Sequence, residues 1–531
     1  MKSALIALAL PFAIYSQSHA QELSQQSLFH RCYAQLTGNA VPLNHALMNQ
    51  VVAGKVTAAV ACKQILSKAL LNAQGSLAST TDAEAKAVLN NFYNFHRTWF
   101  PANNFDSVSG YSSTEHNGSL DVYDATESAL ALTYSMFGLN QKYSDTLNRS
   151  TGVRALRVED SAVVTRIGWK GGHASRMLSN TAQMATSKFQ FRSTELKTTA
   201  VGRNINRHIN IKADVPVIQV GDLVGIVPNT QSFIVPNISM APSGNNTTDK
   251  GILVADFNYT YDLFKNHGGG VIGSPIYLMQ YFGHGFNVKF NGQSKVARRW
   301  SQQNMESFLC ASLPALRESD VQSFVDSSSS AAFRNSSSCV MCHATLDPMA
   351  YTARNFTRGA FDIFRTTQDG DVTLDANGNS ISPPAAYSRN ALAITTYKTT
   401  ASSVGGWPSE PVTDFHKQTP TGRLFYRSAT GVLVDKNVSG IAGLGKAMSE
   451  TDDYYLCAAK RYFEFMTGIK VPIYDRTDPR NSSLNQALSA AAIADRNYVE
   501  SLAKDLRTSN SVIKMVEEIM SSDYYSKENF R

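Results

Sequence analysis

The sequence has little of what marks several large classes of protein. Only 17% of its 531 residues are charged, and the formal net charge is +7. No run of Lys and Arg is interleaved with aromatic residues, so we expect no nucleic-acid partner. The chain also has no Gly-x-Ser-x-Gly motif, no second Cys-x-x-Cys pair and no His-x-x-x-His pair. Neither a serine-hydrolase nucleophile elbow nor a complete zinc site of the usual spacing is therefore indicated.

A long hydrophobic run is missing from the amino-terminal region as well. The apolar stretch Ala4–Tyr15 is interrupted by Pro11, and it is shorter than the roughly 20 residues that a membrane span needs. Lys2 precedes the stretch, and Ser18-His19-Ala20 is a small-x-small cleavage site. We therefore predict a secretory signal peptide cleaved after Ala20, no transmembrane span, and a periplasmic, envelope or secreted location.

Cysteine is scarce, with 6 residues in the chain, and two of them form the most informative motif. The run Cys339-Val340-Met341-Cys342-His343 is the c-type haem attachment pattern, in which both thiols become thioethers and the histidine is the proximal iron ligand. This composition would produce the pattern by chance in about one sequence in a thousand. The alternative is a disulfide or half a zinc site beside a chance histidine. The motif predicts one covalent haem c.

Four cysteines remain outside the motif, an even number in an oxidising compartment. Two disulfides are expected, with three possible pairings, and we favour Cys32 with Cys62 and Cys310 with Cys457. The first would join two neighbouring helices, and the second would tie the segment before the haem motif to the last domain. Four buried free thiols are the alternative.

The sixth iron ligand has several candidates. Met349 lies six residues after His343 and should stay on the proximal side, so packing is its expected role. Met448, Met466 and His416 lie far enough along the chain to reach the opposite face, and Met466 is the favoured distal candidate. A thioether ligand would suit electron transfer, whereas an open position would permit peroxide or oxygen chemistry.

Four further residues have two interpretations each. His96 and Trp99 could serve as a haem ligand or an electron path, but an aromatic stripe at helical spacing favours core packing. Arg298 or Arg299 could pair with a haem propionate, although a solvated helix face is the expected role of each.

The pattern along the chain predicts a mainly α fold with a β-rich insertion, or α+β. Leu28, Tyr33 and Leu36 recur at helical spacing before Gly38, whereas short β-branched stretches between Gly, Pro and Asn occupy the middle of the chain. We divide the chain into a signal peptide (1–20), an N-terminal helical domain (21–155), a β-rich insertion (156–265), a haem-bearing cytochrome c-like domain (266–400) and a C-terminal helical module (401–531).

The residues after the haem motif resemble a known family. In planctomycete-type c-type cytochrome proteins the motif is followed by a hydrophobic residue, Asp-Pro, Leu or Met, a small residue and an aromatic, then Asn, an aromatic and Asp. The positions here that match are Cys339, Cys342, His343, Leu346, Asp347, Pro348, Met349, Tyr351, Asn355 and Phe356. Thr357 stands in place of the family's last Asp, Ala350 in place of Gly, and Phe333-Arg334 in place of a His-Arg pair that many members carry.

The resemblance extends over most of the mature chain but is specific only from about residue 295 to 470. Its implication is a haem-bearing envelope protein, and it does not imply a known reaction.

Three functions are compatible with these features. A single haem motif without a convincing catalytic constellation favours an exported monohaem cytochrome that transfers electrons to or from a redox partner protein. A chain several times longer than electron carriage needs favours an oxidoreductase, peroxidase-like, with an open haem. The β-rich insertion would suit an envelope binding or structural protein in which haem is a folding element. The sequence does not define the oligomeric state.

Overall fold

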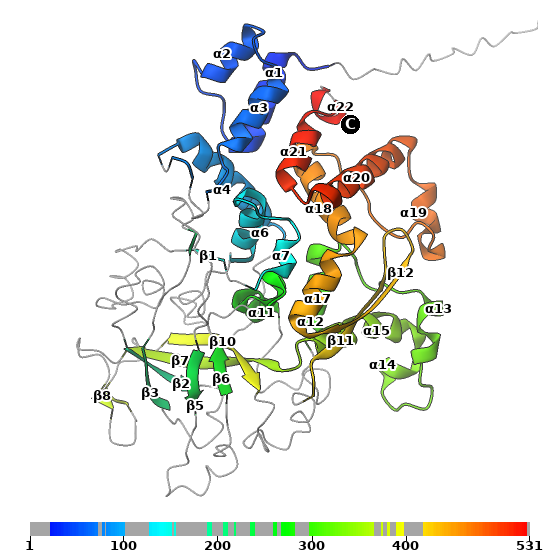
Figure 1. The fold of residues 1–531 in the computed structure, drawn as a ribbon. Helices are drawn as coiled ribbons and strands as arrows, with labels where there is room; N and C mark the ends of the chain where they lie inside the picture. Colours follow the sequence, from blue (N-terminus) through cyan, green and yellow to red (C-terminus); the bar gives the residue numbers. More distant parts are fainter. Residues whose placement is uncertain are drawn as a thin grey trace, which may run out of the picture.

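The computed structural model describes residues 22–72, 77–79, 81–100, 127–150, 153–155, 188–193, 205–210, 217–218, 234–238, 259–262, 267–281, 297–365, 373–374, 380–382, 389–397 and 418–527. The predicted signal peptide and much of the predicted β-rich insertion lie outside these ranges. The described part is mainly helical, as the sequence predicted (Figure 1). None of the described helices is long and apolar enough to cross a bilayer.

Helices form the amino-terminal region. They are α1 (Gln25–Thr37), α2 (Ala46–Val52), α3 (Ala58–Ser67), α4 (Ala83–Arg97), α6 (Glu127–Phe137) and α7 (Asp145–Asn148). α1 ends where Gly38 takes a left-handed conformation with φ 72°, which favours glycine because it has no Cβ. α4 begins after Asp82, whose carboxylate accepts hydrogen bonds from the amides of Glu84 and Ala85. Local sequence thus sets these helix ends.

Strands from two separate parts of the chain form one six-stranded sheet. Its order is β3-β2-β7-β10-β6-β5, and its pairs are antiparallel, with β7 and β10 in the longest register, from Phe356↔Thr396 to Ile363↔Arg389. The strands are β2 (Lys188–Ser193), β3 (Ile205–Asn210), β5 (Ile234–Ile238), β6 (Tyr259–Asp262), β7 (Phe356–Arg365) and β10 (Arg389–Tyr397). The predicted insertion therefore shares a sheet with strands that follow the haem motif.

Short strands form two smaller pairings. β1 (Arg154–Ala155) pairs in parallel with β4 (Val217–Ile218), and β8 (Thr373–Leu374) pairs with β9 (Ser380–Ser382).

The second half of the chain also contains helices and one further hairpin, in addition to β7 to β10. Its helices are α11 (Pro275–Tyr281), α12 (Arg298–Phe308), α13 (Glu318–Val321), α14 (Ala332–Asn335), α15 (Ser337–Tyr351), α17 (Gly440–Ser449), α18 (Asp452–Thr467), α19 (Ser482–Gln486), α20 (Ala490–Ser509), α21 (Val512–Met520) and α22 (Asp523–Ser526), with short 3-10 turns at Gly270–Gly273, Gln322–Phe324 and Pro479–Asn481. The hairpin β11 (Thr421–Arg427) and β12 (Leu433–Ser439) lies within the predicted C-terminal helical module.

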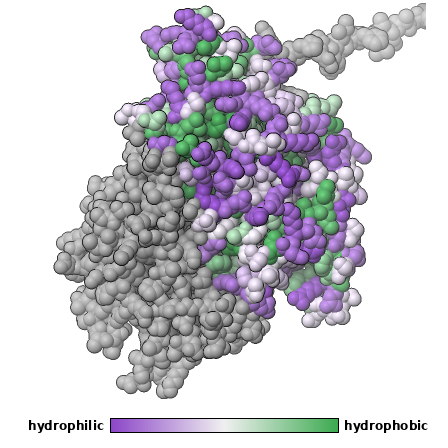
Figure 2. Space-filling view, viewed as in Figure 1, coloured by the Kyte–Doolittle hydropathy of each residue, from purple (hydrophilic) through white to green (hydrophobic). Residues whose placement is uncertain are grey.

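One large hydrophobic core joins the amino-terminal helices to the carboxy-terminal ones. α18 is central to it, with Tyr454, Tyr462, Phe463 and Met466 fully buried. The first and last described segments meet at this core, because the Leu23 amide donates to the Ser526 carbonyl at 2.8 Å. On the face shown in Figure 2, hydrophilic residues cover most of the described surface, with smaller hydrophobic groups between them.

Both favoured disulfides are present. Cys32 on α1 pairs with Cys62 on α3, and Cys310 pairs with Cys457 on α18, with Cα–Cα distances of 6.1 and 5.2 Å. The first joins two neighbouring helices, and the second ties the segment after α12 to α18, as expected from the sequence. The pairing leaves Cys339 and Cys342 as the free thiols.

Candidate functional site

The haem motif lies on the first two turns of α15. This helix packs mainly on β11, α12, α13 and α14 (Figure 1). Cys339 and Cys342 are partly exposed and unpaired. On a helix, residues three apart lie on the same face, so both thiols project on one side of α15. Two thiols on one helix face, next to a histidine, are the donor set that c-type attachment uses.

The environment of Cys342 keeps its sulfur in the thiol form. Burial raises the pKa of the Cys342 thiol, Cys339 raises it further, and Arg480 opposes these effects.

His343 is oriented by a carboxylate on its own helix. Its Nδ1 lies 3.2 Å from Asp347 Oδ2, at i, i+4 spacing. A carboxylate oxygen accepts hydrogen bonds, so Nδ1 is the donor in this contact. No partner for Nε2 occurs among the residues that the structure describes, and the side chain is 27% exposed. This arrangement, with Nδ1 bound to a carboxylate and Nε2 available, is typical of metal-ligating histidine.

Arg298 fixes the carboxylate in turn. Its guanidinium binds Asp347 through two hydrogen bonds, from Nε to Oδ1 and from Nη2 to Oδ2, the second 2.9 Å long. The two side chains are only 12% and 14% exposed. A bidentate pair of this kind is geometrically specific and orients its carboxylate. The solvated helix face expected for Arg298 is wrong, because its side chain is mostly buried and paired with Asp347; a contact with a haem propionate stays a prediction.

An aromatic ring covers one side of His343. The rings of Phe333 and His343 are 4.8 Å apart between centroids and inclined by 31°. Phe333 belongs to α14. Arg334 beside it is exposed. The phenyl ring can restrict rotation of the imidazole, but it has no proton to exchange.

A small hydrophobic cluster packs against α15. Leu316, Val321, Val340 and Phe425 are buried together, and Met341 and Ala344 pack against them. The strand β11 also approaches α15 closely. A Cβ added at Gly422 would lie 2.1 Å from the Pro348 carbonyl oxygen, so this contact requires glycine. The hairpin therefore holds the helix from one side.

The distal candidates lie in other surroundings. Met466 on α18 and Met448 on α17 are fully buried in the large core, whereas Val340 and Met341 belong to the separate small cluster. Met349 is also fully buried, in agreement with a packing role. His416 lies outside the described residues. The large core also includes Met349 of α15, and the role of Met466 as a distal ligand stays a prediction.

His96 and Trp99 belong to the core. His96 is fully buried, with Nδ1 2.7 Å from Thr133 Oγ1 and Nε2 2.6 Å from the Tyr462 hydroxyl. Burial lowers the pKa of His96 to about 3, so the imidazole is neutral. Trp99 is 2% exposed, and the Arg461 guanidinium lies 4.5 Å from its ring centroid. Both ring nitrogens of His96 are occupied, which leaves none for an iron.

Asp347 is the residue whose role the sequence analysis did not assign. Its signal was available, because a carboxylate four residues after a histidine on one helix can reach the imidazole. Arg298 could not be found in this way, since it lies 49 residues earlier in the chain.

The residues on α15 thus fit a covalent haem by the chemistry of their donors. They fit a structural zinc ion less well, because the described part of the chain holds no cluster of three or more His, Cys, Asp or Glu side chains that could bind a metal. Comparisons of the chain with protein-family models, curated proteins and solved structures found no match.

Proposed function

We propose that the chain is an exported monohaem c-type cytochrome that transfers electrons in the periplasm or cell envelope. The observation that carries the proposal is the pairing of two free thiols on one helix face with a histidine whose Nδ1 is bound to Asp347. The resemblance of residues 339–356 to planctomycete-type cytochrome proteins supports the same conclusion.

Each residue has a defined part in this proposal. Cys339 and Cys342 would each add their S–H across a haem vinyl group, forming a carbon–sulfur bond and placing the proton on the other vinyl carbon without net oxidation. His343 would provide Nε2 to the iron, with Asp347 and Arg298 as positioning residues. When bound, haem supplies a one-electron couple between ferric and ferrous iron. The cysteines and His343 are partly exposed, so a partner protein could approach the site from solvent.

Attachment is tested by producing the protein in a host with c-type cytochrome maturation. We expect haem to stay with the protein in acid-acetone extraction, and a pyridine haemochrome spectrum of the thioether type. Cys342→Ala should prevent normal attachment. Ser338→Ala is the matched control, since Ser338 is exposed on the same turn of α15 and bonds only to Ser336 Oγ. Release of all pigment from the wild-type protein would refute the proposal.

An oxidoreductase with an open haem is the second candidate. It is favoured by the burial of Met448 and Met466 in the large core, away from the cluster beneath α15. The spin state separates the two candidates. An electron carrier should have six-coordinate, low-spin ferric haem, and Met466→Ala, followed by Met448→Ala and His416→Ala, should identify the ligand by a change to high spin. High-spin wild-type haem that binds cyanide or turns over peroxide would favour the enzyme, and bound haem with neither property would favour a structural role.

A further inference from the structure

A second site lies near α15 but does not include the haem motif. It is a cavity of about 400 Å³ between the segment 309–316, the end of β11, the start of α18 and the segment 473–481. This volume is within the range of small-molecule sites. Cys339, Cys342 and His343 do not line it.

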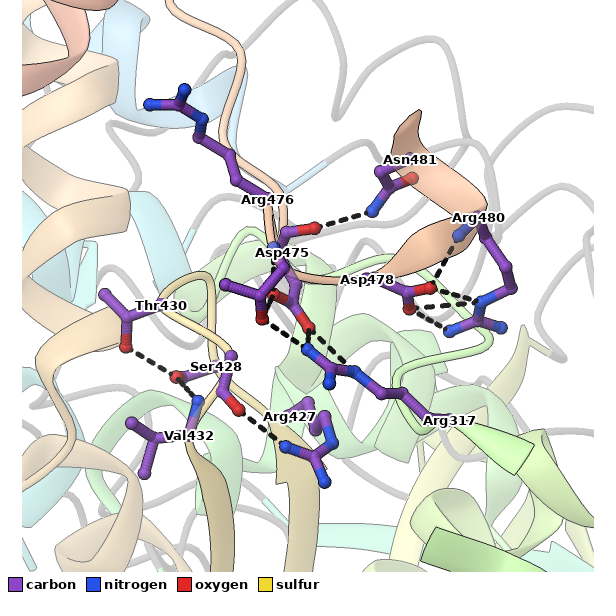
Figure 3. Close-up of polar contacts among 12 residues, drawn as sticks. Arg317, Arg427, Ser428, Thr430, Val432, Asp475, Arg476, Asp478, Arg480 and Asn481 are labelled. Carbon is purple, nitrogen blue, oxygen red and sulfur yellow. Dashed lines mark hydrogen bonds and ion pairs between the residues drawn. The ribbon is translucent and has the colours of Figure 1, made fainter. Parts of the chain in front are cut away.

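The arginines around the cavity are already engaged. Figure 3 shows Arg317 bound to Asp475, and Arg480 bound to Asp478 through Nε and Nη2. Arg427 donates from Nε and Nη2 to Asp320, at 2.7 and 2.6 Å.

The same arginines, and Arg496 nearby, also donate hydrogen bonds to backbone carbonyls. Arg427 Nη1 donates to the Gly431 carbonyl, and Arg480 Nη2 donates to the Leu316 carbonyl. Arg496 is bound to Glu500 and to the carbonyls of Tyr474 and Ala429. With these cations neutralised, the cavity offers no obvious site for an anion.

Asp453 is the exception among the carboxylates. It lies in the first turn of α18, lines the cavity and is 3% exposed. Its Oδ1 accepts a hydrogen bond from the Ala429 amide at 3.1 Å. Its Oδ2 has no hydrogen bond of regular geometry within the described residues, and the group nearest to filling that role is the buried Tyr426 hydroxyl, which interacts with Asp453 and lowers its pKa. An unsatisfied buried carboxylate oxygen is costly, and a cationic donor is the group that would satisfy it best.

Two more features define the kind of cation. The Tyr474 hydroxyl, from another residue that lines the cavity, is also buried without a partner in the described part of the chain. Leu309, Leu313, Pro314 and Ile473 form an apolar wall. An ammonium group has three N–H donors and no acceptor, so it suits these oxygens, while the wall suits an apolar body.

We propose that this cavity binds a small organic cation, a primary amine with an apolar body, whose ammonium group pairs with Asp453. The site is independent of the haem. Water alone in the cavity is the competing outcome.

The test compares three probes of the same shape and different charge: benzylamine, benzyl alcohol and benzoate. Affinities are measured by calorimetry at neutral pH on the exported full chain. We expect benzylamine to bind at least tenfold more tightly than benzyl alcohol, and benzoate not to bind. Equal affinity for the amine and the alcohol, or no binding of either, would overturn the proposal.

Variants locate the binding. Asp453→Asn keeps an oxygen for the Ala429 amide and should abolish the preference for the amine. Asp452→Asn removes the same charge one residue away, where the side chain is 75% exposed and paired with Arg507, and should leave the preference intact. Ala315→Leu fills the cavity and should weaken binding of both probes tenfold or more. An unchanged preference in Asp453→Asn, or unchanged affinity in Ala315→Leu, would refute the site even if the other variant failed to fold.

Discussion

Ionisation of the buried Asp453 side chain should contribute a loss of stability as the pH rises from mild acid to neutral. Burial raises the pKa of Asp453 from 3.8 to about 6, while the hydrogen bonds from the Ala429 amide and the Tyr426 hydroxyl oppose the rise. At this residue the folded state therefore binds more protons than the unfolded state between about pH 4 and pH 6. The contribution of Asp453 to stability must fall as pH rises through this window, whereas Asp320 and Asp475, whose pKa values are lowered, contribute in the opposite direction.

The size of the effect follows from the pKa difference. One pKa unit corresponds to about 1.4 kcal/mol, so a shift from 3.8 to about 6 destabilises the fold by about 3 kcal/mol once Asp453 is fully ionised. Asparagine at this position does not ionise. Asp453→Asn should therefore gain about 3 kcal/mol relative to the wild type between pH 4 and pH 7.

The assay is urea unfolding of both proteins at intervals of one pH unit, without added amine. Other titrating groups are common to both proteins, so the difference isolates residue 453. Asp452→Asn is the control, because Asp452 is exposed, and its difference from the wild type should not follow this course. A difference for Asp453→Asn that stays constant with pH, or that favours the wild type as pH rises, would refute the reasoning.

Three further predictions concern the disulfide, the proximal histidine and the core. Replacing both Cys310 and Cys457 by Ala should lower the free energy of unfolding by up to about 5 kcal/mol, because the disulfide closes a loop of 147 residues. A loss below about 1 kcal/mol, measured by urea unfolding, would contradict this. Asp347→Asn should leave haem attached but raise its reduction potential, by an amount on the order of tens of millivolts, since the imidazole becomes a weaker donor; an unchanged potential in a redox titration would argue against that role. Tyr462→Phe removes the hydroxyl bound to His96 Nε2 and should cost about 1–3 kcal/mol in thermal or urea unfolding, whereas a neutral effect would mean that water replaces the hydroxyl.

Local chemistry made parts of the fold predictable. The end of α1 at Gly38 and the start of α4 after Asp82 follow from residues within a turn of each helix end. The disulfides could be predicted because two of the 6 cysteines belong to the haem motif, and the other four allow only three pairings. The helix ends depend on residues close together in the sequence, and the disulfides depend on the number of cysteines.

The rest depends on contacts between distant segments. The β11–β12 hairpin lies in a region predicted to be helical, and its position depends on a close approach of Gly422 to α15 that no periodicity reveals. The partners of β7 likewise come from β2 and β10, on both sides of it in the sequence. Asp453 could not be singled out from the sequence, because what distinguishes it is a buried carboxylate oxygen without a regular hydrogen bond. Only the packed structure shows this.

The Cys310–Cys457 bond turns the stretch between these residues into a covalent ring that contains α15. A single cleavage of the backbone anywhere inside the ring leaves both pieces joined through the disulfide. A protease could therefore cut the stretch without releasing the helix that carries Cys339, Cys342 and His343. In denaturing gel electrophoresis the cleaved protein would migrate as one chain until a reductant broke the disulfide. Cleavage of the backbone in this stretch would therefore leave α15 covalently joined to α18.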